Sequence, residues 1–470
     1  MSQLVMLHLG LGAFHRAHQA VYMHRLMQAG QTDWTLVAGN TRPDMPETLA
    51  ALVRQAGAYT LETVSPSGQR VYERITSIGR VVEWRSDLAG LIDQGGQAQT
   101  RIVSFTVTEA GYGLNAADGL DLENSPQLQA DVQAARAGRP GASLYAALTA
   151  ILRERMRRGA GPVTLLNCDN LRHGGTRARQ ALLAFMALLD DDALVDWTRA
   201  NTTSPNAMVD RITPRSTPDV QARVRAATGH DDPAALMAEQ YIQWVVEDDF
   251  IAGRPAWEQV GVQMVDAVAP YEEAKIRLLN ATHSCVAWAG TLRGHTYIHE
   301  AVQEPSIRRM ACDYVTEDAI PALSRPDHPS PIDLPAYRDT VLARFANAAI
   351  RDTNERVAMD GFSKIPGFIV PTVRERLQRG QGIEHVAVLP ALFLAFLQRW
   401  HGQQLPFAYR DQAMDAALAH SVCTAPDPVD AFCALPALWG DLAGHEQVLS
   451  ALRRAQDRVM AWQASAPVPH

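Results

Sequence analysis

The sequence Leu4-Val5-Met6-Leu7-His8-Leu9-Gly10-Leu11-Gly12 is a short apolar run that ends in two closely spaced glycines. A helical pattern from Phe14 to Ala29 follows it. Strand, glycine turn and helix in this order open a dinucleotide-binding βαβ unit, where the glycines let the backbone approach a pyrophosphate. His15 stands where the Gly-x-Gly-x-x-Gly motif has its third glycine, and a plain tight turn is the alternative interpretation. We favour cofactor binding, because the motif opens a long chain and Arg16 lies just inside the helix.

The second expected strand, Thr35 to Gly39, does not decide between NAD and NADP. An NAD enzyme often places Asp or Glu at the end of this strand to hold the ribose hydroxyls. Here Asn40 and Arg42 follow the strand, and the nearest acid is Asp44. Arg42 could meet a 2′-phosphate, so both cofactors stay open at this point.

Polar residues follow two further expected strands. The run 102–107 leads into Thr108 and Glu109, and the run 163–166 leads into Asn167-Cys168-Asp169-Asn170. Ligands bind outside the carboxyl ends of parallel strands, so these residues are candidates for a site, although Asn170 could equally be a turn residue. A β pair, 59–63 with 71–78 around the turn 65–68, and a last strand, 261–267, complete the expected sheets.

Length and composition limit the class of protein. A chain of 470 residues, with 47% hydrophobic and 20% charged residues, predicts a soluble globular protein of two domains, with three as the alternative. The net charge of −8 argues against a nucleic-acid binder. Five scattered cysteines indicate reduced thiols, and the strand at the N-terminus leaves no room for a signal peptide. We therefore expect a cytoplasmic protein that binds neither nucleic acid nor membrane.

An uninterrupted helical pattern from Tyr271 to Trp288 follows Pro270. At about 100° per residue, His283 lies roughly 80° and Asn280 roughly 140° from Lys275, so all three share one half of the helix. Lysine, amide and imidazole could supply a base, a donor and an orienting group. A solvated lysine is the ordinary alternative.

The pattern of the chain changes at residue 270. Strands dominate before it, and helical patterns dominate after it, at 271–292, 337–350, 385–400, 429–436 and 443–463. We therefore predict an α/β protein with a Rossmann-type dinucleotide-binding domain, residues 1–269, and a mainly helical substrate and catalytic domain, residues 270–470.

Six short motifs together resemble the polyol-specific long-chain dehydrogenases, the mannitol dehydrogenase family. They are Gly-Leu-Gly-Ala-Phe-His-Arg-Ala-His (10–18), Thr-Val-Thr-Glu-Ala-Gly-Tyr (106–112), Asn-Cys-Asp-Asn (167–170), Asp-Arg-Ile-Thr-Pro (210–214), Lys275-x5-Asn280-x2-His283 and Ser-Lys-Ile-Pro (363–366). The resemblance implies an enzyme that oxidises a polyol to a ketose with NAD, or less readily with NADP; we expect a monomer, although the sequence itself does not fix the oligomeric state. D-arabinitol, oxidised at carbon 4 to D-xylulose, is the expected substrate; D-mannitol and a hexuronate are the alternatives.

The resemblance also implies roles for individual residues. Lys275 would be the general base, Asn170 and Asn280 would stabilise the alkoxide, His283 would hold a neighbouring hydroxyl, and Glu272 would pass the proton to solvent. Three residues would line the polyol site: Asp210, Arg356 and Lys364. The expected cofactor residues are Gly10, Gly12, Phe14, Arg16, Asn40, Arg42, Thr108 and Glu109.

This chemistry needs no metal. A lysine becomes a useful base when desolvation or a neighbouring cation lowers its pKa, and amide donors can meet the developing negative charge. A zinc alcohol dehydrogenase is the rival enzyme class; His15-x-x-His18 offers two ligands, but thiolates at zinc spacing are missing. A sugar-binding protein, which would need neither base nor glycine turn, is the rival outside enzymes.

Overall fold

The computed structural model describes residues 3–107, 109–115, 119–327 and 329–465, apart from the side chains of residues 109 and 110. The chain divides into two compact units. The first comprises Met1–Ser65 and Gln69–Ala269, and the second comprises Pro66–Gly68 and Pro270–His470. The first unit is a Rossmann-type domain and the second is helical, as the sequence predicted. Each unit is described by itself.

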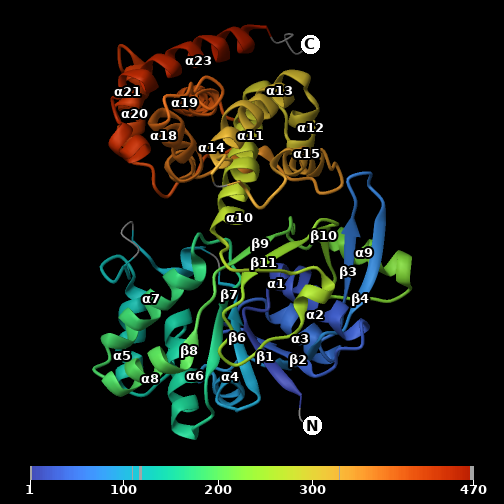
Figure 1. Cartoon of the computed structure of the whole chain (residues 1–470). Coiled ribbons are helices and arrows are strands. Elements are labelled where there is room, and N and C mark those ends of the chain that lie inside the picture. Colours follow the sequence, from blue (N-terminus) through green and yellow to red (C-terminus); the bar gives the residue numbers. More distant parts are fainter. Residues whose placement is uncertain (1–2, 108, 116–118, 328, 466–470) are drawn as a thin grey trace. The chain divides into compact units, whose positions relative to one another are not determined.

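The first unit is built on a parallel six-stranded sheet (Figure 1). Its strands, in spatial order, are β5 (Ile78–Val82), β2 (Trp34–Gly39), β1 (Leu4–Leu9), β6 (Thr100–Phe105), β7 (Val163–Asn167) and β8 (Thr202–Thr203). All neighbouring pairs run parallel, with Leu9 opposite Gly39 on one side and Phe105 on the other. The carboxyl ends of β1, β2 and β6 therefore meet at one edge.

Helices cover both faces of this sheet because its central strand is buried on both sides. Leu7 and Leu9 of β1 share a core with α4, α5, α6, α7 and α8, whereas Met6 shares a second core with α1, α2 and α3. The helices of the first unit are α1 (Ala13–Ala17), α2 (Gln19–Gln28), α3 (Pro46–Arg54), α4 (Ala89–Gly95), α5 (Pro126–Arg136), α6 (Leu144–Arg158), α7 (Gly174–Ala187), α8 (Asp192–Asn201) and α9 (Pro218–Thr228), with 3-10 turns at Glu109–Tyr112 and Trp257–Val260.

Two expectations for this unit were wrong in detail. The helix expected over 14–29 is interrupted at His18, whose φ of −125° and ψ of −87° separate α1 from α2. The strand expected over 71–78 ends at Ile75, and Ile78 begins β5 in the main sheet. Period-two patterning cannot show that a chain leaves one sheet and enters another.

Two small sheets complete the first unit. One consists of β10 (Leu236–Glu239), β3 (Tyr59–Val64) and β4 (Arg70–Ile75), and its β3–β4 hairpin is the expected β pair. The other consists of β12 (Gln263–Val265), β11 (Gln243–Glu247) and β9 (Ala207–Asp210).

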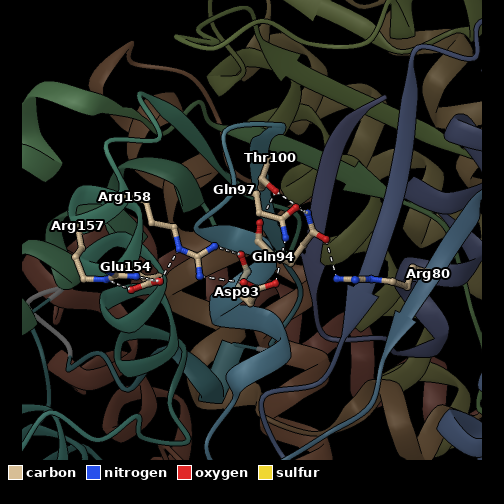
Figure 2. Close-up of polar contacts among 8 residues, drawn as sticks. All are labelled: Arg80, Asp93, Gln94, Gln97, Thr100, Glu154, Arg157 and Arg158. Carbon is tan, nitrogen blue, oxygen red and sulfur yellow. Dashed lines mark hydrogen bonds and ion pairs between the residues drawn. The ribbon is translucent and has the colours of Figure 1, made fainter. Parts of the chain in front are cut away.

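A polar network lies at the amino end of β6, away from the glycine turn (Figure 2). Gln94 of α4 accepts a hydrogen bond from Arg80 at 2.7 Å and donates to Thr100 at 3.0 Å. Arg158, at the end of α6, joins Asp93 at 2.9 Å and Glu154 at 2.5 Å. We call the eight residues of Figure 2 the edge network: Arg80, Asp93, Gln94, Gln97, Thr100, Glu154, Arg157 and Arg158.

The second unit is organised around α11 (Ala281–Arg293), which is buried on nearly every side. It packs against α12, α13, α16 and α19. Close packing depends on small residues: a Cβ at Gly290 would lie 2.6 Å from the Cβ of Ala301 and from the Asn354 side chain. A helix that is apolar almost all round belongs in a core, so its few polar residues, such as His283, are informative.

The second unit contains a further set of helices (Figure 1). They are α10 (Ala269–Ala274), α12 (Ile298–Gln303), α13 (Pro305–Asp313), α14 (Ile320–Leu323), α15 (Leu334–Phe345), α16 (Asn354–Ala358), α17 (Gly361–Lys364), α18 (Val370–Gln378), α19 (Val388–His401), α20 (Ala416–Thr424), α21 (Pro428–Cys433), α22 (Pro436–Trp439) and α23 (Glu446–Ala464). A 3-10 turn lies at Gly440–Leu442, and π-helical turns lie at Lys275–Asn280, Tyr314–Ala319 and Ile365–Ile369.

Candidate active site

Gly10 shapes the turn after β1. Its φ is 106°, and a Cβ there would lie 2.1 Å from the carbonyl oxygen of Thr106, so only glycine fits. At Gly12 a Cβ would meet nothing within 4 Å. Asn40 fixes the turn from β2, because its Oδ1 accepts a hydrogen bond from the Leu11 amide at 2.7 Å. The open side at Gly12 fits the close approach of a cofactor pyrophosphate.

Two stacked histidines support this turn. The rings of His8 and His15 lie 3.4 Å apart at an angle of 11°. His8 also contacts Ser104 Oγ at 2.8 Å and Thr106 Oγ1 at 3.1 Å. Burial lowers the pKa of His8 to about 3, although the Gly10 carbonyl acts in the opposite direction, so the ring is neutral near pH 7. His15 thus fills the place of the third glycine and packs α1 onto β1 through its ring.

Phe14 and Arg16 lie in different surroundings. Phe14 is half-buried, and its ring stacks 5.0 Å from that of His18. Arg16 is buried; its guanidinium donates to the Ala234 carbonyl and lies 5.4 Å from the centre of the Tyr59 ring. These contacts hold the charge of Arg16 in the interior of the first unit. A cofactor contact by Arg16 stays a prediction.

The loop after β2 holds the other expected cofactor residues. Asn40 is buried, and its Nδ2 donates to Asp44 Oδ1 at 3.0 Å, whereas Arg42 is exposed. An exposed arginine is compatible with either cofactor, so the loop does not select between NAD and NADP. Thr108 and the side chain of Glu109 lie outside the described residues.

Asp169 joins the loops that follow β6 and β7. Its Oδ2 accepts hydrogen bonds from the Val107 amide at 2.8 Å and from the Tyr112 hydroxyl at 2.6 Å. Asn167 also donates to that hydroxyl. Asn170, the expected alkoxide donor, directly follows and is exposed. The sequence interpretation named both residues in one polar cluster but gave a role only to Asn170, whereas Asp169 fixes the loop that carries it.

Asp210 lies at the end of β9 and is 5% exposed. It stands opposite Gln243 of β11 in the antiparallel pair. A group that binds substrate hydroxyls must be held in a fixed position. The backbone of Asp210 meets this requirement, because it ends a buried strand.

Lys275 lies in the first position of a π-helical turn and is 7% exposed. Glu272, one turn earlier in α10, is 5% exposed. A π turn closes i→i+5 hydrogen bonds and is wider than an α turn, so the angle expected between Lys275 and Asn280 from α-helical spacing was wrong. Such turns frequently occur at functional sites.

Arg277 holds this π turn in place. Its guanidinium is buried and meets Glu375 through two hydrogen bonds, at 2.7 and 2.9 Å, and Glu273 through a third at 2.9 Å. The Tyr314 hydroxyl donates to the Arg277 carbonyl at 2.9 Å. The sequence interpretation did not single out Arg277, although an arginine between Lys275 and Asn280 on an apolar helix was a usable signal.

His283 forms a polar group with Asp352, which precedes α16, and with Arg356, which lies in α16. Its ring stacks on Phe345, with centroids 4.3 Å apart, and its Nε2 lies 3.4 Å from Asp352 Oδ2. The same carboxylate receives Arg356 through two hydrogen bonds, at 2.6 and 2.5 Å. Burial lowers the pKa of His283, although Asp352 acts in the opposite direction. We call His283, Asp352 and Arg356 the His283 group.

Lys364 ends α17 and donates from Nζ to the Val357 carbonyl at 2.5 Å. Burial lowers the pKa of Lys364 to about 8; Asp360 opposes this shift and Arg356 adds to it. The turn Ile365–Ile369, directly after Lys364, packs against the turn that carries Lys275. The predicted residues His283, Arg356 and Lys364 therefore all lie on helices of the second unit.

The lysine count is a signal that the sequence interpretation did not use. Of 43 lysines and arginines in the chain, only Lys275 and Lys364 are lysines. Lysine can lose its proton in a folded protein, whereas arginine cannot. The chain therefore keeps its only two titratable amine side chains at two predicted site positions.

The described residues show no sign of two other kinds of site, a metal centre and a membrane span. Among the described residues, no three His, Cys, Asp or Glu side chains are grouped so that they could hold a metal ion. In the same part of the chain, none of the helices is long and apolar enough to cross a membrane. The five cysteines are free. Catalysis without a metal stays a prediction.

Comparison with known proteins places the whole chain. The family model of the mannitol dehydrogenase Rossmann domain matches residues 5–259, and that of the mannitol dehydrogenase C-terminal domain matches residues 267–460. The chain is 57% identical to a D-arabinitol 4-dehydrogenase of Ralstonia nicotianae, over 98% of this chain and 97% of that one. It is 51% identical to a D-arabinitol 4-dehydrogenase of Klebsiella pneumoniae, over 96% and 97%.

A solved structure agrees with this placement. Mannitol 2-dehydrogenase of Pseudomonas fluorescens, in a ternary complex with NAD and D-mannitol, superposes with a TM-score of 0.82 at 32% identity and covers 99% of this chain and 93% of its own. The chain therefore belongs to the mannitol dehydrogenase family of oxidoreductases, with the Rossmann domain followed by the C-terminal domain of that family.

Proposed function

We propose that the protein is an NAD-dependent D-arabinitol 4-dehydrogenase that oxidises D-arabinitol to D-xylulose. The observation that carries this proposal is 57% and 51% identity, over nearly the full length, to two D-arabinitol 4-dehydrogenases from different bacteria. NAD as cofactor rests on the family and on the NAD complex of the mannitol 2-dehydrogenase relative. The open turn at Gly12 and the absence of a Cβ at Gly10 fit this cofactor.

The proposed chemistry starts from the proton of the reacting hydroxyl. Bound NAD would accept the hydride. Lys275, nearly excluded from solvent in its π turn, takes the hydroxyl proton as general base, and Glu272 passes it onward. Asn170 and Asn280 donate hydrogen bonds to the oxygen as negative charge develops, a type of contact typically worth about 3 kcal/mol in a dry site.

The remaining polar residues recognise the polyol. His283, Asp210, Arg356 and Lys364 pair with consecutive hydroxyls of the open-chain substrate. A site of this kind rejects a substrate with a missing or inverted hydroxyl, because its own buried polar groups are then left unpaired. It discriminates less against one more carbon at the far end, so D-mannitol is the second candidate substrate, favoured by the D-mannitol complex of the relative.

A panel of substrates tests this proposal. The purified protein is assayed by NADH or NADPH absorbance with D-arabinitol, D-mannitol, D-sorbitol, D-xylulose and D-fructuronate. We expect the highest kcat/KM for D-arabinitol with NAD, and activity unchanged after prolonged chelation. A tenfold preference for D-mannitol would move the assignment to a mannitol 2-dehydrogenase, and reduction of fructuronate alone would overturn it. A higher kcat/KM with NADP would show that Arg42 decides the cofactor.

A further inference from the structure

We propose that Asp352 is a positioning residue of the polyol site, which fixes the tautomer of His283 and the plane of the Arg356 guanidinium with a single carboxylate. The inference rests on the proposed function, since it concerns how that site binds its substrate. Asp352 precedes α16 and touches both residues.

The carboxylate is shared between the two partners. Oδ1 accepts a hydrogen bond from Arg356 Nε at 2.6 Å, and Oδ2 accepts one from Arg356 Nη2 at 2.5 Å. The same Oδ2 lies 3.4 Å from His283 Nε2, which is an ion-pair distance without the geometry of a hydrogen bond. The Asp352 side chain is 9% exposed and that of His283 is 12% exposed, whereas that of Arg356 is 64% exposed. Asp352 therefore links a buried ring to an accessible guanidinium.

The backbone around Asp352 is fixed independently of this pairing. The Asp352 carbonyl accepts a hydrogen bond from the Ile298 amide at 2.9 Å, and Thr353 forms an isolated β-bridge with Tyr297. Arg351 has a φ of 53°, so the chain turns sharply just before Asp352. Thr353 Oγ1 accepts from the Arg356 amide at 3.2 Å and caps α16. A carboxylate on such a backbone is preorganised.

The surroundings of His283 favour one tautomer. Phe345 stacks on one face of the ring, and burial keeps the pKa of His283 below its ordinary value. The charged groups that act on the ring are Asp352, which favours protonation, and Arg356 and Lys364, which oppose it. A neutral imidazole beside a carboxylate carries its proton on the nitrogen that faces that carboxylate, here Nε2. Nδ1 is then an acceptor, suited to a substrate hydroxyl.

The pairing also determines the protonation of Asp352 itself. Burial alone would raise the pKa of Asp352, but His283 and Arg356 outweigh burial and hold that pKa well below its usual range. The carboxylate therefore stays charged throughout the working pH range. Removing its charge would take away the negative group that faces Nε2 of His283 and would weaken the two hydrogen bonds from Arg356.

The experiment compares Asp352→Asn with Asp248→Asn. Asp248 is a matched control in the first unit, because it receives Arg254 through two hydrogen bonds, at 2.7 and 2.8 Å. We expect Asp352→Asn to lower kcat/KM for D-arabinitol by about 10- to 100-fold, a loss of the size seen when the carboxylate behind a metal-ligating histidine is removed. KM for NAD stays within about twofold of wild type in both variants, and the control keeps its full kcat/KM.

A second measurement reads the tautomer in the wild-type protein itself. Two-bond 1H–15N correlations of wild-type protein labelled with 15N-histidine report the tautomer of each ring, and His283→Gln identifies the signal of His283. We expect the Nε2–H form, and Asp352→Glu, which keeps the carboxylate, should recover part of the activity lost in Asp352→Asn.

The outcomes separate the two proposals. Wild-type protein without D-arabinitol oxidation would overturn the proposed function before any variant is tested. Active wild type with an Nδ1–H His283, or a folded Asp352→Asn with wild-type kcat/KM, would overturn the role of Asp352 and leave the function standing.

Discussion

The edge network and the His283 group contain the same kinds of residues in different surroundings. In both, arginines pair with carboxylates at hydrogen-bond distance. In the edge network the Arg157 and Asp93 side chains are 68% and 54% exposed. In the His283 group the carboxylate and the imidazole are nearly excluded from water.

This difference decides what each pairing can do. Exposed ion pairs contribute about 0–1 kcal/mol, because water screens the charges and ordering long side chains opposes the gain. Buried charges must be fully paired, since removing one partner leaves another without compensation. The comparison shows that burial of the carboxylate, not pairing or the sharing of a partner, distinguishes the His283 group from the edge network.

Lys275→Ala should give the largest effect. A general base typically contributes about 10²–10⁴ to the rate, and Lys275 is buried where water cannot readily replace it. We expect kcat for D-arabinitol to fall by at least this factor, with an unchanged circular dichroism spectrum and unchanged affinity for NADH. A folded variant with near-wild-type turnover would remove Lys275 from the mechanism.

Lys364→Met should separate activity from stability. Burial lowers the pKa of Lys364 from 10.5 in an unfolded chain to about 8, so the charged amine destabilises the folded state below pH 8. Methionine removes this destabilising charge, and it also removes a proposed contact with the polyol. At pH 7 we expect a higher Tm, equivalent to at most about 3 kcal/mol, together with a raised KM for D-arabinitol.

The pH dependence of that difference has a definite sign. Between about pH 8 and 10.5 the unfolded chain binds more protons at Lys364 than the folded protein does, so wild-type stability from this group rises with pH. The stability advantage of Lys364→Met should therefore shrink across this window, as measured by thermal unfolding at several pH values. A difference in stability that stays constant or grows with pH would contradict the lowered pKa of the Lys364 amine.

Glu375→Gln tests whether the π turn needs its ion pair. The change removes the charge that meets buried Arg277, while Glu273 remains. We expect a loss of about 1–2 kcal/mol in the free energy of unfolding and a fall in kcat of about tenfold, because small displacements of a catalytic group are costly. Glu384→Gln, which removes an exposed carboxylate paired with Arg454, is the matched control. Unchanged kcat in a destabilised variant would limit Arg277 to a structural role.

Glu154→Gln should give the smallest effect. Glu154 pairs with Arg157 and Arg158 at the surface of the edge network (Figure 2). We expect the free energy of unfolding to change by at most about 0.5 kcal/mol and kcat/KM to stay at the wild-type value. A loss of activity would show that the edge network communicates with the site and would end the distinction between the two regions.

Much of the first unit could be predicted because its signals are local. A strand, its glycine turn and the polar residues at strand ends lie within a few positions of one another, so the parallel sheet and the place of Asn170 followed from the sequence. The end of β4 could not be predicted in this way, since Ile75 and Ile78 belong to different sheets. The packing role of Arg16 could not be predicted either, because its partners Tyr59 and Ala234 are distant in sequence.

Less of the second unit could be predicted, because its geometry depends on tertiary contacts. Regular spacing placed Lys275, Asn280 and His283 on one α-helix, but contacts of Arg277 with Glu375 and Tyr314 accompany a π turn that spacing cannot show. Asp352 lies 69 positions after His283, and no spacing in the sequence links the two residues. Only the fold brings it to the imidazole.

Chemical rescue of Lys275→Ala tests the central claim most directly: that a buried amine of the second unit takes the proton from the polyol. Turnover of D-arabinitol with NAD is measured in this variant as methylamine or ethylamine is added. The account predicts a rate that rises in proportion to the concentration of unprotonated amine, with no such rise in the wild type. A folded Lys275→Ala variant that binds NADH but is not accelerated by any small amine, or that turns over without one, would contradict it.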